Sequence, residues 1–132
     1  DLHSFPTRRS SDLHIDGILD KPGDAVRCAA QLERLSGTTA VFYTACAVIA
    51  FDGTRDHVHV DRTDVSFRVL SRGEIVRYVE RERPFDCAGG FKVEGLGISL
   101  FERVTTEDPT ALIGLPLIWL AGSLRELGYA VP

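Results

Sequence analysis

The feature that most constrains the fold of this chain is a nearly unbroken apolar run from Thr39 to Phe51. The run is rich in Val, Ile, Phe and Tyr, and such β-branched and aromatic residues favour strands. Polar residues do not alternate with the apolar ones, as they would in a strand with one face in water. The run therefore predicts a central strand that is covered on both faces.

The segments next to this run carry helix and strand signals. Asp24–Leu35 places its apolar residues on one helical face, and Gly37 follows as a stop signal. After the turn residues Asp52-Gly53-Thr54, the region from about His57 to Val69 predicts a second strand. Its alternation predicts one face in solvent and one apolar face. The side chains expected on the apolar face are Val65, Phe67 and Val69.

The rest of the chain predicts a helix, a strand and a helix. Ser71 and Glu74 fit a capping box, and the helix they begin is expected to end near Glu82. Residues 98–104 predict a third strand, and residues 116–127 a last helix, with Pro116 at its first position. The order of elements indicates an α/β fold, a mixed twisted sheet with flanking helices. The inner side of the last helix is expected to carry Leu117, Leu120, Ala121, Leu124 and Leu127.

Composition argues against two classes of partner. A net charge of −4 gives no broad attraction to a nucleic acid polymer or to an anionic membrane. No apolar run approaches the roughly 20 residues that a helix needs to cross a bilayer.

The three cysteines, Cys28, Cys46 and Cys87, lie far apart and form no CxxC pair. Reduced thiols in a cytoplasmic protein are the simplest interpretation.

The first thirteen residues differ from everything that follows. They show no hydrophobic period, and Asp1-Leu2-His3 recurs as Asp12-Leu13-His14. The segment resembles a translated sequencing adapter rather than a native sequence, and a disordered natural tail is the alternative. We therefore expect residues 1–13 to be an adapter-like leader and residues 14–132 to form the folded unit.

A series of short motifs runs through the remainder of the chain in a fixed order. They are Asp16-Gly17, Lys21-Pro22, Leu35-Ser36-Gly37, Phe42-Tyr43-Thr44, Val65-x-Phe67-Arg68-x-Leu70-Ser71, Cys87-Ala88-Gly89-x-Phe91-Lys92-x-Glu94-Gly95-x-Gly97, Leu100-Phe101-Glu102-Arg103 and Gly114-Leu115-Pro116-Leu117. Each motif alone is weak evidence, but their order and spacing are specific. Together they resemble the Maf family of nucleoside triphosphate pyrophosphatases, in particular its 7-methyl-GTP branch.

The resemblance implies an activity, a cofactor and a compartment. Members of the family hydrolyse a nucleoside triphosphate to the monophosphate and pyrophosphate with a divalent cation, for which Mg²⁺ or Mn²⁺ is expected. The substrate implied here is 7-methyl-GTP, and the compartment is the cytoplasm. A dTTP or UTP pyrophosphatase of the sister branch, and a non-catalytic module linked to septum formation, are the alternatives. A homodimer is left open, and the sequence does not identify the metal ligands.

The family motif that carries the general base lies upstream of the position of His14. The resemblance therefore implies that this chain is the C-terminal portion of a Maf-like domain. It also implies that the chain holds no catalytic residue and is inactive as a fragment, so pyrophosphate release by the purified chain would refute this expectation.

Three residues are predicted to bind the substrate. Lys21 matches the family lysine that faces the phosphates, where a compact ammonium offsets negative charge. Glu94 can accept two hydrogen bonds from the guanine edge, and it also attracts the cationic 7-methylated base. Lys92 in the same glycine-rich loop either contacts phosphate, pairs with Glu94, or is solvated surface. The glycines of this loop permit either close approach to a ligand or a tight turn.

Other candidate residues have stronger structural interpretations. Phe91 could stack on the cationic base, but a core position is favoured. Arg68 fits a structural ion pair at least as well as a ligand contact. His57 and His59 share one strand face without a third metal ligand, which favours exposed strand histidines over a metal site. Cys87 has no partnered histidine, which argues against nucleophilic catalysis and favours a small buried residue.

Overall fold

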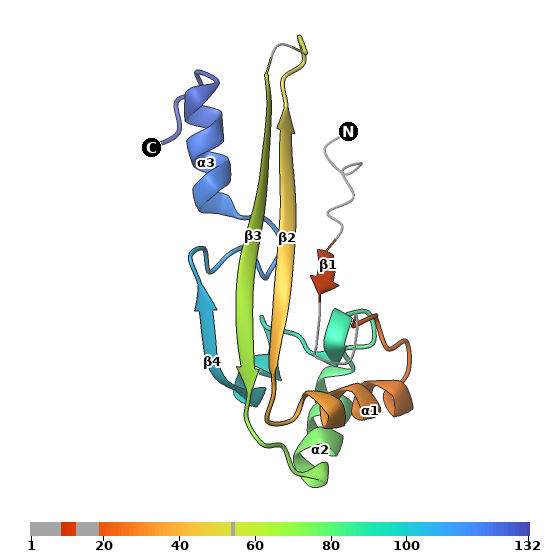
Figure 1. Ribbon diagram of the computed structural model, residues 1–132. Helices are drawn as coiled ribbons and strands as arrows, with labels where there is room; N and C mark the ends of the chain where they lie inside the picture. The colour runs from red at the N-terminus through yellow and green to blue at the C-terminus, as the bar shows by residue number, and fades with distance from the viewer. Residues whose placement is uncertain (1–8, 13–18, 54) are drawn as a thin grey trace.

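The computed structural model describes residues 9–12 (backbone only), 19–53 and 55–132 (Figure 1). Its helices and strands are β1 (Arg9–Asp12), α1 (Ala25–Leu35), β2 (Thr39–Ile49), β3 (Asp56–Phe67), α2 (Arg72–Glu82), β4 (Phe101–Thr106) and α3 (Leu117–Glu126), with 3₁₀ turns η1 (Ala88–Gly90) and η2 (Leu96–Leu100). Most of the predicted leader and the Asp16-Gly17 motif lie outside the described residues.

The sheet has the strand order β1-β2-β3-β4, and each described neighbour pair is antiparallel. β2 and β3 form a long hairpin whose register runs from Thr39 opposite Ser66 to Ile49 opposite Asp56. β1 and β4 flank only the half of this hairpin that is nearer to α1 and α2 (Figure 1). A sheet with flanking helices confirms the predicted α/β class. No described helix combines the length and the apolar character that a membrane crossing needs.

Local capping signals set the starts of α1 and α2. The Asp24 carboxylate accepts a hydrogen bond from the Arg27 amide at 2.8 Å, and the Ser71 hydroxyl accepts one from the Glu74 amide at 3.2 Å. Each bond satisfies a backbone donor that has no partner within its own helix. The sequence therefore predicted both helices to within a residue.

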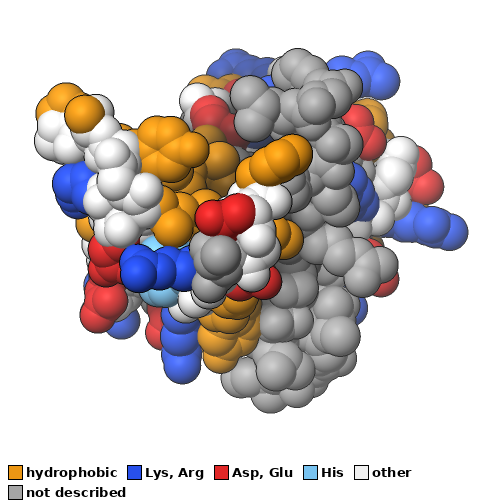
Figure 2. All heavy atoms as spheres, turned by 90° about the horizontal axis from the view of Figure 1, so that it is seen from above, with side chains coloured by type: hydrophobic (Ala, Val, Ile, Leu, Met, Phe, Trp, Pro, Cys, Tyr) orange, Lys and Arg blue, Asp and Glu red, His pale blue; other side chains and the backbone are white. Residues whose placement is uncertain are grey.

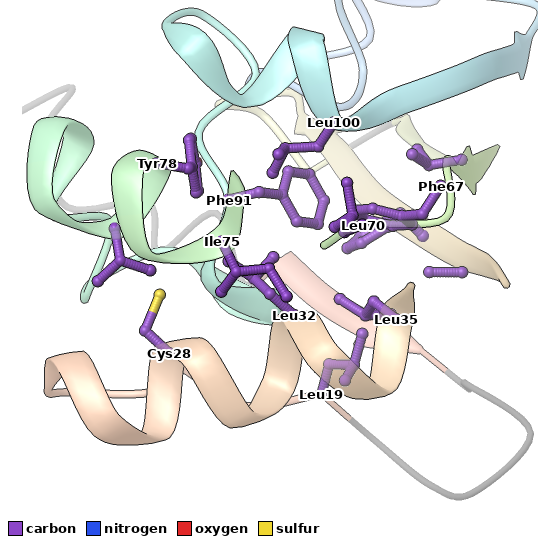
Figure 3. Packing of buried hydrophobic residues seen from close by; sticks show 14 of the residues in the cluster. Leu19, Cys28, Leu32, Leu35, Phe67, Leu70, Ile75, Tyr78, Phe91 and Leu100 are labelled. Atoms are coloured by element: carbon purple, nitrogen blue, oxygen red, sulfur yellow. The ribbon is translucent and has the colours of Figure 1, made fainter. Parts of the chain in front are cut away.

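The core lies between α1, α2 and one face of the hairpin. Figure 3 shows α1 and α2 facing each other across Cys28, Leu32 and Ile75, which are all at most 1% exposed. Four aromatic rings extend this core toward the sheet through edge-to-face contacts with centroids 5.2 to 5.3 Å apart. These rings belong to Phe42, Phe67, Phe91 and Phe101.

The prediction that the Thr39–Phe51 run is covered on both faces was wrong. In β2, buried and more exposed residues alternate, so only one face enters the core. Toward the hairpin tip Ile49 is 62% exposed and Phe51 fully exposed, because α1 and α2 reach only the other half. Hydrophobic side chains gather at this end of the molecule, among charged ones (Figure 2).

Three smaller predictions also need correction. Val69 is exposed, because β3 ends at Phe67 and the chain leaves the sheet there. The first part of the predicted third strand is the 3₁₀ turn η2, and the strand begins only at Phe101. In α3 the buried residue is Ser123, whereas Leu117 is half exposed, because α3 lies over polar side chains of β3 rather than over an apolar face.

β1 falls inside the predicted leader. Its backbone pairs with Val41–Thr44 of β2, at the edge of the sheet. The origin of residues 1–13 and the boundary at residue 14 stay predictions.

Candidate functional site

The loop that carries Lys21 is anchored to α1. Lys21 is exposed, whereas the following Pro22 is fully buried. The carbonyl of Asp20 accepts a hydrogen bond from Nε2 of Gln31 at 3.0 Å. Lys21 therefore projects from a loop that is held in place by the burial of Pro22 and by the hydrogen bond between Gln31 and Asp20.

The same loop is joined to the segment that leads into the glycine-rich loop. The Gly23 amide donates to the Phe85 carbonyl at 3.0 Å, and the Gly89 amide donates to the Asp20 carbonyl at 3.4 Å. These two hydrogen bonds enclose Lys21 on both sides along the chain. Two segments that are distant in sequence are thus connected at the predicted site.

Two glycines allow this segment to cross α1 closely. Gly89 and Gly90 have φ angles of +77° and +74°, which side-chain-bearing residues rarely adopt. A Cβ atom on Gly90 would lie 2.8 Å from Sγ of Cys28. Burial, together with the smaller effects of the nearby Cys87 and Asp24, raises the pKa of Cys28 to about 11, so this thiol is protonated and unreactive at neutral pH.

Lys92 and Glu94 lie on a tight turn that follows Phe91. The Lys92 carbonyl accepts hydrogen bonds from the amides of Gly95 at 3.2 Å and Gly97 at 2.9 Å. The side chains of Lys92 and Glu94 are both exposed. The turn therefore offers a cation and a carboxylate to solvent from a closed backbone loop.

Two side chains of α2 hold this turn, and the sequence analysis missed both. The Lys92 amide donates to Oη of Tyr78 at 2.7 Å, and the Leu96 amide donates to Oε1 of Glu82 at 2.7 Å. One signal was present in the sequence, because Glu82 lies four residues after Tyr78 and so projects from the buried side of the helix.

The three predicted site residues fall on two anchored loops. Among the described residues, Lys92 and Glu94 form no ion pair with each other, and no hydrogen bond joins either of them to the Lys21 side chain. Four hollows on the described surface are lined by other residues than Lys21, Lys92 and Glu94. Their convergence on one ligand stays a prediction.

Two other candidates have structural roles. Phe91 is 4% exposed within the aromatic core, as predicted, and is not available to stack on a base. Nη2 of Arg68 lies 2.9 Å from the Glu74 carboxylate, and its Nε donates to the Ser99 carbonyl at 2.9 Å. Arg68 therefore forms the structural ion pair that was one of its two interpretations.

The histidines lie beneath α3 rather than in solvent. Nδ1 of His57 is 2.5 Å from the Ser123 hydroxyl, and His59 stacks on Trp119 with ring centroids 5.1 Å apart. Nε2 of His59 is also 3.1 Å from the Asp61 carboxylate. No group of three His, Cys, Asp or Glu side chains among the described residues could hold a metal ion.

Cys87, predicted to be buried, is half-buried.

Asp108 fixes the start of α3. Its carboxylate is 3% exposed and accepts hydrogen bonds from the amides of Thr110 and Ile118, both at 2.9 Å, and from the Thr110 hydroxyl at 2.6 Å. Burial acts to raise the pKa of Asp108, but these hydrogen bonds outweigh it and hold the pKa below its usual range.

The fold and its anchored loops define an α/β domain with the motif order of a known nucleotide-hydrolysing family. The family model described as Maf-like protein matches residues 10–127, so the chain belongs to the Maf family. It is 54% identical over 116 residues to the 7-methyl-GTP pyrophosphatase of Chromohalobacter salexigens, covering 88% of this chain and 60% of that protein.

Two further relatives carry the same name. The 7-methyl-GTP pyrophosphatase of Xanthomonas oryzae pv. oryzae is 49% identical over 120 residues, which cover 89% of this chain and 62% of the relative. The 7-methyl-GTP pyrophosphatase of Hahella chejuensis is 49% identical over 115 residues, which cover 87% of this chain and 58% of that relative. The chain thus spans about 60% of the length of these relatives.

Proposed function

We propose that this chain forms the nucleotide-binding portion of a nucleoside triphosphate pyrophosphatase that hydrolyses 7-methyl-GTP to 7-methyl-GMP and pyrophosphate. The observation that carries the proposal is the hydrogen bond from Gly89 to the Asp20 carbonyl, which ties the Lys21 loop to the segment that continues into the Glu94 turn. The names of the similar proteins support the choice of substrate.

Each loop takes one end of the nucleotide in this proposal. The Lys21 ammonium faces the triphosphate and offsets charge that accumulates as the phosphoanhydride bond breaks. Glu94 accepts hydrogen bonds from N1–H and the exocyclic amino group of 7-methylguanine, and its negative charge attracts the cationic ring. Lys92, two residues away on the same turn, adds positive charge near the phosphates.

A divalent cation, Mg²⁺ or Mn²⁺, is part of the proposal for the whole protein. The described residues do not supply a ligand set for it, since they contain no suitable group of three donors. The roles given to Lys21, Lys92 and Glu94 therefore do not pass through a metal.

The proposal extends to compartment and partners. The three cysteines lie far apart in the sequence and form no CxxC pair, which suits reduced thiols and a cytoplasmic protein. The net charge of −4 argues against a nucleic acid polymer or an anionic membrane as the partner, whereas a small nucleotide depends on local positive charge such as that of Lys21 and Lys92. A homodimer is the remaining open proposal, and the mass measured by size-exclusion chromatography with light scattering tests it.

Calorimetric titration of the chain with 7-methyl-GTP, GTP, dTTP and UTP tests the proposed substrate. We expect 7-methyl-GTP to bind most tightly, because only this base combines the guanine edge with a positive charge. Glu94→Gln is expected to weaken 7-methyl-GTP binding about tenfold, as expected for loss of a charge-assisted hydrogen bond. The matched control Glu102→Gln, which changes an exposed carboxylate on β4, leaves the affinity unchanged. Tighter binding of dTTP or UTP would contradict the proposal.

A further inference from the structure

We propose that Tyr78 and Glu82 are positioning residues for base recognition: from α2 they hold both ends of the turn that presents Glu94. This inference rests on the proposed function, since it assigns a role to residues that do not themselves contact the nucleotide. It concerns two side chains whose contacts with the turn are direct.

Tyr78 provides the first anchor. Its side chain belongs to the core and the residue is only 4% exposed, so packing fixes the position of its hydroxyl. Oη accepts the Lys92 amide at 2.7 Å, just where the chain leaves the aromatic core at Phe91. Burial raises the pKa of Tyr78 well above its usual value, so the hydroxyl stays neutral throughout the physiological range. The start of the turn is therefore tied to the buried core.

Glu82 provides the second anchor. Its Oε1 accepts the Leu96 amide at 2.7 Å, a charge-assisted hydrogen bond from the far end of the turn. The same carboxylate lies against Gly95, where an added Cβ would come within 2.4 Å of Oε1 and 2.7 Å of Oε2. Gly95 thus provides the space that lets the carboxylate reach the backbone.

The two anchors act on the turn as a pair. Residues four apart lie next to each other on one side of a helix, so Tyr78 and Glu82 approach the turn from the same direction. Glu94 lies between the two anchored amides of Lys92 and Leu96. Between the anchors, the Lys92 carbonyl accepts the amides of Gly95 and Gly97 and closes the loop.

The consequence is a recognition carboxylate whose backbone is fixed before the ligand arrives. A pre-ordered loop loses less conformational entropy on binding, so the base-specific part of the affinity depends on these anchors. The triphosphate contacts of Lys21 depend on a different loop, anchored by Gln31 and Gly89. Loss of the Glu82 anchor at the Leu96 end of the turn is therefore expected to reduce selectivity for the base, while Lys21 keeps its contact with the triphosphate.

The test compares Glu82→Ala with Glu82→Gln, which retains an acceptor oxygen, and with Tyr78→Phe. Glu80→Ala is the matched control, because Glu80 is an exposed carboxylate on the same helix. For each variant, the affinities for 7-methyl-GTP and for UTP are measured, together with hydrogen exchange of the Leu96 amide. We expect Glu82→Ala to lower the ratio of the two affinities about tenfold through weaker 7-methyl-GTP binding, in line with the loss of an acceptor for a charge-assisted bond. Glu82→Gln is expected to restore most of the ratio, and Glu80→Ala to leave it unchanged.

The outcomes separate the inference from the proposed function. Selective binding by the unaltered chain, with the same selectivity in Glu82→Ala, overturns the positioning role and leaves the proposed function in place. Equal losses for both nucleotides also overturn it, because a purely structural role weakens both. Binding of 7-methyl-GTP no tighter than UTP by the unaltered chain overturns the proposed function and this inference with it.

Discussion

At the scale of single residues, Gly97 is the position with the least space in the candidate site. A Cβ atom there would lie 2.2 Å from the Lys92 carbonyl oxygen and 2.8 Å from the Lys92 nitrogen. The sequence left two explanations open for the glycines of the loop that carries Lys92 and Glu94: close approach to a ligand, or a tight turn. For Gly97 the structure supports the tight turn, because the atoms in the way belong to the chain itself.

Gly97→Ala is therefore expected to open the turn and lower the free energy of unfolding by about 2 kcal/mol, a typical cost of overpacking. Affinity for 7-methyl-GTP is expected to fall as well, since Glu94 moves with the turn. Urea denaturation and calorimetric titration measure the two effects. In the control Gly122→Ala, the new Cβ meets only Arg125 at 3.9 Å within α3, so stability is expected to rise by about 0.5 kcal/mol. Equal stability of both variants would contradict this account of Gly97.

Asp108 gives a prediction with a defined pH dependence. Its pKa is lower in the folded chain than in the unfolded one, because of the hydrogen bonds from Thr110 and Ile118. The stabilisation is therefore complete above the unfolded value and is lost as the pH falls through the folded pKa. Asp108→Asn is expected to lower the unfolding free energy by about 2 kcal/mol at pH 7.

The difference between Asp108→Asn and the unaltered chain is expected to shrink as the pH falls below about 4, the usual range for an aspartate. Urea denaturation at pH 7 and at pH 3 measures it. Asp86→Asn, which changes an exposed aspartate, is the control. A difference that stays constant between the two pH values would rule out the carboxylate as its source.

At the scale of elements, α2 connects the core to the candidate site. One side of the helix buries Ile75, Tyr78 and Val79 in the core. The end of that side carries the Glu82 carboxylate to the Glu94 turn. The helix ends at Glu82, and the following Arg83, with a φ of +49°, turns the chain away in a left-handed conformation. The stability of α2 therefore determines how well the turn is held.

Ser71→Ala removes the N-terminal cap of α2 and is expected to lower the unfolding free energy by about 1 kcal/mol. The physical reason is that the Glu74 amide loses its acceptor, the Ser71 hydroxyl. Thermal or urea denaturation measures the loss. Ser71→Asp retains a capping acceptor and is expected to keep the stability of the unaltered chain. A similar loss in both variants would show that the cap is not the cause.

At the scale of the whole molecule, the sequence predicted the features that depend on residues close together in the chain. Periodicity from Asp24 and the capping box at Ser71 predicted two helix starts, and Phe91 was assigned to the core. The coverage of the Thr39–Phe51 run could not be predicted, because it depends on how far α1 and α2 reach along the hairpin. On α3 the sequence analysis missed the burial of Ser123 and the exposure of Leu117, because the helix lies against histidines of β3.

The candidate site was predictable to a similar extent. Motif spacing placed Lys21, Lys92 and Glu94 on loops, and the structure describes both loops as anchored and exposed. The anchors themselves, Tyr78 and Glu82, could not be found from motifs. Almost any residue can donate its backbone amide, so these hydrogen bonds do not require a particular residue type in the turn. Such contacts depend only on the three-dimensional path of the turn.

The most direct test of the account is a titration of the isotope-labelled chain with 7-methyl-GTP, followed by the backbone amide resonances in NMR spectra. If the two loops bind one nucleotide, the amides of Lys21 and of Glu94 shift together and saturate at the same ligand concentration. Shifts confined to one loop, or shifts that saturate at different concentrations, would contradict a single shared site.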